Sequence, residues 1–171
     1  MTSKYFRTSA LGVAILAGVA LAGCGTDSDP QENTARAADA ITVAAPWVKA
    51  AETGMTGAFA DFTNTGDRDI RIVAVDSPAS ARGELHEMAT GDAGTPVMRE
   101  VEDGFLVPTG DTRSLEPGAD HIMLMELTAP LIAGSDTDIT VTFDDGSSTT
   151  FSAQVRDFAG NREEYAPGHG N

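Results

Sequence analysis

The sequence predicts an all-β domain, and three observations support this prediction. Nine short apolar or β-branched runs follow one another along the chain, a pattern typical of a β-sandwich or β-barrel. Turn-forming residues separate the runs, and the 171 residues include 18 Gly and 8 Pro. No stretch of the mature domain keeps the apolar period of a helix over a dozen residues. The length suits one domain with short appendages.

The nine runs are the expected strands. They cover residues 41–48, 57–63, 70–75, 83–88, 96–101, 105–107, 121–127, 139–143 and 149–155. Gly, Asn and Asp residues supply the backbone conformations that tight turns need. Such turns are expected at residues 64–67, 91–94, 116–118 and 144–146.

The N-terminal residues carry the features of a lipoprotein signal. Lys4 and Arg7 precede an uncharged apolar run over residues 10–22, which ends in small residues before Cys24. The run is shorter than the roughly 20 residues of a membrane span, and the order of charge, apolar run and cysteine is typical of a secretory signal with a lipobox. A core cysteine beside a fortuitous apolar helix would not explain that order. We therefore expect a signal peptide over residues 1–23, a lipid on Cys24, and a location on the extracytoplasmic face of the cell membrane.

The rest of the chain divides into three expected parts. Residues 24–40 are polar and lack large apolar side chains, so we expect a disordered, lipidated tether. The folded domain is expected over residues 41–156. The polar residues 157–171, with several glycines, are expected to form a flexible tail.

Composition excludes several classes of function. Acidic residues outnumber basic ones by 26 to 11, so nucleic acid is not an expected partner. A single cysteine excludes an intramolecular disulfide, a Cys-rich zinc site and an iron–sulfur cluster. The sequence has no G-x-S-x-G elbow, no H-E-x-x-H and no phosphate loop. We therefore expect no enzymatic activity.

Histidine and methionine residues gather in one part of the chain. Six of them lie within 40 residues: His86, Met88, Met98, His121, Met123 and Met125. Residues two apart on a strand share a face, so His121 and Met123 project together, as do His86 and Met88. A hairpin through residues 91–94 would return Met98 to the neighbourhood of His86. We expect one site of imidazoles and thioethers, with partly exposed ligands at strand ends.

This set of ligands favours copper(I). Thioethers are soft and neutral, whereas Mg, Ca and Mn prefer hard oxygen ligands. A blue-copper centre is disfavoured because it needs a cysteine thiolate, and Cys24 is expected to carry the lipid. Two imidazoles and two thioethers leave the charge of copper uncompensated, so we expect easy release, which is chemistry for transfer.

Other residues near the cluster have weaker claims as ligands. Met125 lies one step beyond Met123, and Met88 lies similarly beyond His86. Both are expected to pack around the ligands, since a methionine in a strand is more often a core residue. Met55, in the turn at residues 53–55, ranks below them.

Four short motifs stand around these residues: Ala45-Pro46-Trp47, Glu84-Leu85-His86-Glu87-Met88, Leu115-Glu116-Pro117-Gly118 and His121-Ile122-Met123-Leu124-Met125. Together they resemble the PCuAC-type periplasmic copper chaperone family, over about residues 41–156. The resemblance implies a cupredoxin-like Greek-key β-barrel or sandwich without the blue-copper cysteine. It implies copper(I) ligands at His86, Met98, His121 and Met123. It also implies a role in assembling the CuA centre of cytochrome c oxidase, with an oxidase subunit or another copper carrier as partner.

The chain departs from the family pattern at three places. Met98 stands alone where many members have a second methionine two positions earlier. The hairpin between His86 and Met98 is slightly longer, and Asp120 stands where an aromatic residue often precedes the second histidine. The Asp120 carboxylate would lie near the metal and could admit copper(II).

Three hypotheses of function remain. The leading one is a lipid-anchored extracytoplasmic copper(I) metallochaperone. The second is a copper-sequestering or resistance protein that uses the same site. The third is a β-sandwich interaction module with incidental His and Met. Stoichiometric copper(I) binding under reducing, anaerobic conditions separates the first two from the third.

Overall fold

The computed structural model describes residues 35–91, 94–159 and 164–165. The expected signal peptide, Cys24, most of the expected tether and most of the expected tail lie outside these residues. Within the described ranges, no helix combines the length and the apolar character needed to cross a membrane.

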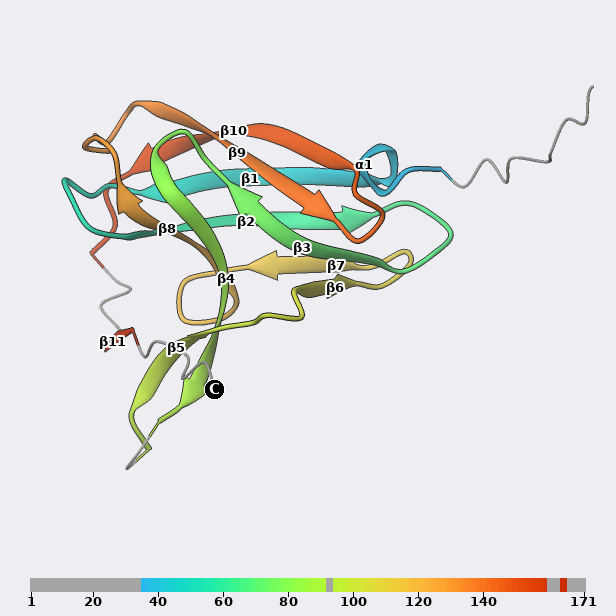
Figure 1. Cartoon of the computed structure of the whole chain (residues 1–171), viewed down its shortest axis with the longest axis horizontal. Coiled ribbons are helices and arrows are strands. Elements are labelled where there is room, and N and C mark those ends of the chain that lie inside the picture. The colour runs from blue at the N-terminus through green and yellow to red at the C-terminus, as the bar shows by residue number, and fades with distance from the viewer. Residues whose placement is uncertain (1–34, 92–93, 160–163, 166–171) are drawn as a thin grey trace, which may run out of the picture. The chain divides into compact units, whose positions relative to one another are not determined.

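The described chain is almost entirely β-structure, which confirms the predicted fold class (Figure 1). All the expected strands are present, with small differences in their bounds. One helical turn, α1 (Ala37–Ala40), precedes the strands β1 (Ile41–Lys49), β2 (Thr56–Asn64), β3 (Ile70–Asp76), β4 (Ser80–Thr90), β5 (Pro96–Glu100), β6 (Phe105–Val107), β7 (Thr112–Leu115), β8 (His121–Leu127), β9 (Asp136–Phe143), β10 (Ser148–Arg156) and β11 (Glu164–Tyr165).

The strands form one sheet that folds back on itself. Their order is β11-β5-β4-β8-β2-β1-β10-β9-β3-β6, and β7 pairs with β2 in the middle of the sheet. Because β6 pairs with β3 at one end and also packs against β7, the two halves face each other and enclose a core. Fully buried side chains from both halves fill it, among them Phe62, Ile72, Phe105, Ile122 and Phe143. This is the barrel or sandwich that the sequence predicts.

Two strands were not expected from the sequence. β7 pairs with β2 through Leu115 and Ala60, but Leu115 is its only large apolar residue and the only one of its four that is buried. Strands are predicted from runs of apolar residues, and a mostly exposed strand such as β7 has no such run. β11 is two residues of the expected tail, and it pairs in parallel with β5 beside Val97 and Met98.

The folded domain begins earlier than residue 41, where the expected tether ends. Ala37 in α1 is fully buried, and its N–H donates to the Asp145 carboxylate at 2.7 Å. The N–H of Ala38 donates to the Ser147 hydroxyl at 3.0 Å. These acceptors lie in the turn between β9 and β10, so small residues that look unable to form a core pack against a distant part of the chain. No local pattern in residues 35–40 signals that contact.

A β-bulge in β1 sets which residue faces β2. Pro46 has no N–H for the ladder, and the pairing shifts between Ala44 and Trp47, with Ala45 at a φ of 48°. The shift places Trp47, instead of Pro46, opposite Phe59. The two rings then stack with centroids 4.4 Å apart.

A close approach at Gly83 positions β4. A Cβ at this residue would lie 2.5 Å from the carbonyl oxygen of Val75 in β3. Glycine therefore lets β4 pass close to β3 at the point where β4 pairs with β8 through Leu124, before it reaches β5. Figure 1 shows β4 continuing into a hairpin with β5 that projects beyond the other strands.

Candidate metal site

His86 in β4 and His121 in β8 lie directly opposite each other in the sheet and are called the His pair below. Both side chains are fully buried. Their ring centroids are 5.7 Å apart with an angle of 63° between the planes. Phe59 in β2 lies beside them, with its ring 6.3 Å from that of His121. Strand pairing therefore brings two imidazoles from distant parts of the sequence together.

Three methionines form a second buried group, separate from the main core. Met98, Met123 and Met125 pack together, and the half-buried Met88 packs against them; these four are called the methionine cluster. Met88 lies opposite Met98 in the β4–β5 hairpin. Because directly opposite residues share a face of a sheet, the pairing places the methionine cluster on the face that carries the His pair. The main-core residues of β8 occupy the other face.

All four candidate ligands are buried, which differs from the expectation of partly exposed ligands at strand ends. The exposed fraction is 0% for both histidines, 4% for Met98 and 3% for Met123. β4 lies between β5 and β8 in the sheet, yet Met98 of β5 contacts Met123 of β8. Long thioether side chains from the two strands that flank β4 therefore meet over this face and bury one another.

Each imidazole of the His pair is oriented by a hydrogen bond through one ring nitrogen. Nε2 of His86 lies 2.8 Å from the Glu84 carboxylate, and Nδ1 of His121 lies 2.7 Å from the carbonyl oxygen of Ala119. Since both partners are acceptors, these nitrogens carry the protons in the neutral rings. Metal-binding histidines in proteins commonly donate their second nitrogen to a carboxylate or a backbone carbonyl in this way. Nδ1 of His86 and Nε2 of His121 are then the nitrogens with a lone pair.

Glu84 is a buried carboxylate that the sequence analysis missed. It is 6% exposed, and it bridges His86 and Arg82, whose Nη1 lies 2.7 Å from its second oxygen. The sequence could have predicted this contact, because Glu84 lies two residues before His86 and so shares its face of β4. The carboxylate of Glu84 contacts the ring of His86. Its negative charge would therefore partly compensate the positive charge of a cation bound to that ring. The expected uncompensated site is thus not what the structure contains.

Burial lowers the pKa of His86 below the ordinary value of a histidine. The hydrogen bond and charge of Glu84 act in the opposite direction, as does the charge of Glu100, and His121 lowers the pKa further. Burial has the larger effect, because the free-energy cost of removing a charged imidazole from water exceeds the stabilisation that Glu84 and Glu100 give the charged form. His86 is therefore neutral at pH 7, which is the form that binds metals.

Asp120 does not join the His pair or the methionine cluster. Its carboxylate forms an ion pair with Arg113, whose guanidinium lies 5.0 Å above the ring of Phe105 in the main core. Arg113 lies in β7, so this ion pair holds the Asp120 carboxylate beside β7.

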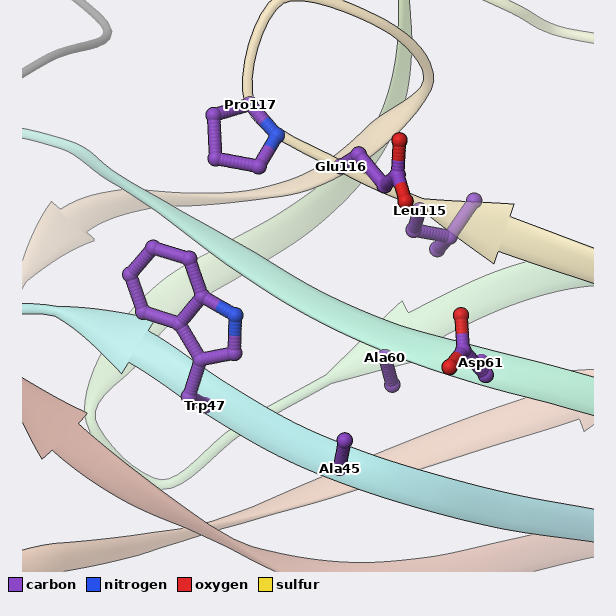
Figure 2. Close-up of a pocket in the computed structure, with 7 residues that line it drawn as sticks. All are labelled: Ala45, Trp47, Ala60, Asp61, Leu115, Glu116 and Pro117. Atoms are coloured by element: carbon purple, nitrogen blue, oxygen red, sulfur yellow. The ribbon is translucent and has the colours of Figure 1, made fainter.

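Two pockets lie near these groups. One, of about 250 Å³, is lined by Lys49, Ala51, Met55, Thr56, Gly57, Met98 and Met123. A larger one, of about 430 Å³, lies around Trp47 and contains no His or Met. Figure 2 shows its lining residues, Ala45, Trp47, Ala60, Asp61, Leu115, Glu116 and Pro117, with the indole facing the proline. Of these two pockets, the smaller one is lined by the candidate ligands Met98 and Met123 and the larger one by none. The volume of a pocket therefore does not identify the metal site.

Hard or borderline metal ions find no obvious alternative site in the part of the chain that the structure describes. There, no three His, Cys, Asp or Glu side chains are grouped so that they could hold a metal ion. The side chains that this face offers beside the His pair include the thioethers of the methionine cluster, which select soft ions.

Comparison of the sequence with known proteins identifies a lipoprotein family. The family described as "Putative lipoprotein LpqE-like" matches residues 41–155. "Putative lipoprotein Lxx21020" of Leifsonia xyli subsp. xyli (strain CTCB07) is 41% identical over 165 residues, which cover 96% of this chain and 97% of that protein.

Comparison of the fold identifies PCuAC domains. The copper-bound PCuAC domain from PmoF2 matches with a TM-score of 0.59 and 21% identity, over 72% of this chain and 97% of that domain. The solution structure of CuI-DR1885 from Deinococcus radiodurans matches with a TM-score of 0.55 and 28% identity, over 73% of this chain and 85% of that one. These matches confirm the resemblance that the sequence motifs indicate.

Proposed function

Because the chain belongs to the LpqE-like lipoprotein family, we propose that it is a lipid-anchored, extracytoplasmic carrier of copper(I). One observation carries this proposal: two oriented imidazoles and two buried thioethers share one face of the sheet. The ligands are Nδ1 of His86, Nε2 of His121 and the sulfur atoms of Met98 and Met123.

The spacing of the His pair suits a shared ion. A metal–nitrogen bond is about 2 Å long, so two imidazoles on one ion hold their ring centres at most about 6 Å apart. The observed 5.7 Å lies within that limit. Thioethers complete a set that prefers copper(I) to zinc. The similarity to CuI-DR1885, a copper(I)-bound protein, supports the same assignment.

The experiment is a copper(I) titration of the folded domain against a copper(I) chelator, without oxygen. Met98→Leu and Met123→Leu keep the apolar volume, so the fold should survive while the soft ligand is lost. Each should weaken binding by about tenfold or more, an energy of at least about 1.4 kcal/mol. Met125→Leu is the matched control, since Met125 is equally buried but is not a proposed ligand. Unchanged affinity in both ligand variants would remove these sulfur atoms from the site.

We further propose that the bound copper is delivered to an acceptor, with the CuA site of cytochrome c oxidase as the first candidate. Complete burial of the His pair also favours the alternative of sequestration, because buried ligands release an ion slowly. Deletion of the gene separates the two. Loss of oxidase metallation at ordinary copper levels indicates delivery, whereas loss of copper tolerance alone indicates sequestration.

The proposed anchor is Cys24. Cys24→Ala should move the protein from the membrane fraction to the soluble fraction, or stall its processing, without changing copper(I) affinity of the domain. Tethering raises the local concentration of the carrier near membrane-bound acceptors. An unlipidated protein at native level should therefore metallate the acceptor poorly, and full metallation would show that delivery does not need the anchor.

A further inference from the structure

Met55 lies at the rim of the pocket that leads to the methionine cluster. Its side chain is 40% exposed, whereas Met98 and Met123 in the same pocket are 4% and 3% exposed. One sulfur-bearing side chain thus faces solvent while two others lie deeper in the same pocket.

Hydrogen bonds on both sides hold Met55 in place. The carbonyl oxygen of Gly54 accepts from the N–H of Leu127 at 2.8 Å, which ties the turn to the end of β8. The hydroxyl of Thr56 donates to the carbonyl oxygen of Lys49 at 2.7 Å, which ties it to β1. Gly54 also adopts a φ of 82°, a conformation that favours glycine. The backbone of Met55 is therefore fixed relative to the strands that carry the site.

The pocket is open toward Met123 because of the residue across from it. Gly57 in β2 is the register partner of Met123 in β8, so the two residues share a face of the sheet. Gly57 has no side chain to cover Met123 on that face. Both residues line the pocket with Met55. The pocket therefore places three methionine side chains around one space, with Met55 at its exposed end.

We propose that Met55 is the entry and exit ligand for copper(I), binding the ion transiently between a partner or chelator and the buried site. This inference rests on the proposed function. In entry, a bond from the Met55 sulfur to copper forms as a donor ligand leaves, and this bond then breaks as Met123 or Met98 binds. Copper remains in the +1 state, and the thioethers are neutral, so no electron or proton moves. The step is needed because the buried ligands cannot contact an external ligand directly.

The test measures transfer rates and affinity separately, in Met55→Leu and in the unchanged protein. Copper(I)-loaded protein is mixed with excess bathocuproine disulfonate in a stopped-flow instrument, and the reverse transfer starts from a weak copper(I) complex. Leucine keeps the volume but has no sulfur lone pair. We expect transfer in both directions to slow about tenfold while equilibrium affinity changes less than about threefold. Met88→Leu is the matched control, because Met88 is the partly exposed member of the methionine cluster but does not line this pocket.

The outcomes separate this inference from the proposed function. Wild-type transfer rates in Met55→Leu overturn the role of Met55. A loss of affinity as large as the loss of rate also overturns it, since Met55 would then be a ligand of the resting site. Equal slowing in Met88→Leu overturns it too, by showing a general effect of the methionine cluster. If the unchanged protein binds no copper(I), the proposed function itself fails.

Discussion

Replacement of Glu84 by Gln tests whether a buried carboxylate orients and compensates the metal site. Glu84 accepts from Nε2 of His86 and from Arg82, and it is 6% exposed. Gln keeps the size and one acceptor, so the His86 bond can survive as a neutral one. The amide nitrogen then faces either the imidazole N–H or the guanidinium, and both are donors.

The magnitude follows from these contacts. Removing a carboxylate that holds a metal-binding histidine typically lowers metal affinity about 10- to 100-fold. Because Gln retains one acceptor, we expect the lower end, about tenfold for copper(I), or about 1.4 kcal/mol. In the variant, the amide N–H of the glutamine faces another N–H donor. This unsatisfied contact should also lower the free energy of unfolding by about 1 to 3 kcal/mol.

The assay is competition with a copper(I) chelator, together with urea unfolding of the apoprotein. Glu87→Gln is the control, because Glu87 is 37% exposed and pairs with the exposed Arg99. An exposed ion pair contributes about 0 to 1 kcal/mol, so this variant should bind copper(I) as the unchanged protein does. Copper(I) affinity of Glu84→Gln within about twofold of the unchanged protein would refute the reasoning.

Three further predictions concern protonation, ring stacking and the first helical turn. The lowered pKa of His86 means that the unfolded chain takes up the proton first as the pH falls, so apoprotein stability should decline between about pH 7 and pH 5. His86→Gln should flatten that decline in urea unfolding, and an equal slope in both proteins would contradict the burial argument. Trp47 is the single tryptophan and stacks on Phe59 beside the His pair, so copper(I) should change its fluorescence up to one equivalent, and less so in Phe59→Leu. A constant emission would place copper elsewhere. Burial raises the pKa of Asp145, but hydrogen bonds from Ser147 and the backbone of α1 outweigh it and lower the pKa to about 2. Because Asp145 is exposed to water, screening weakens these contacts, so Asp145→Asn should lower the free energy of unfolding at pH 7 by about 1 kcal/mol. Unchanged urea unfolding would show that the α1 contact is weak.

Much of the fold follows from patterns that span only a few residues. Apolar runs and turn residues predict the strands because alternation and turn chemistry depend on near neighbours. The same local rule places His121 and Met123 on one face, and it would also have placed Glu84 beside His86. The residues that could bind a soft ion were therefore readable from the sequence.

Burial and long-range contacts were decided by tertiary structure. Whether the face of His121 meets solvent depends on which side chains of β5 and β8 meet across β4, which no short pattern encodes. The same holds for Asp120, which looks like a ligand beside His121 but pairs with Arg113.

The first turn and the pocket rim show the same division. Ala37 looks like part of a tether until the β9–β10 turn supplies its acceptor, and Met55 looks incidental until Gly57 opens the pocket beneath it. The sequence by itself determined nine of the strands and the chemistry of their side chains, because these depend on neighbours in the chain. Only the tertiary structure decided which of those side chains meet, because strand register joins residues that no local interaction connects.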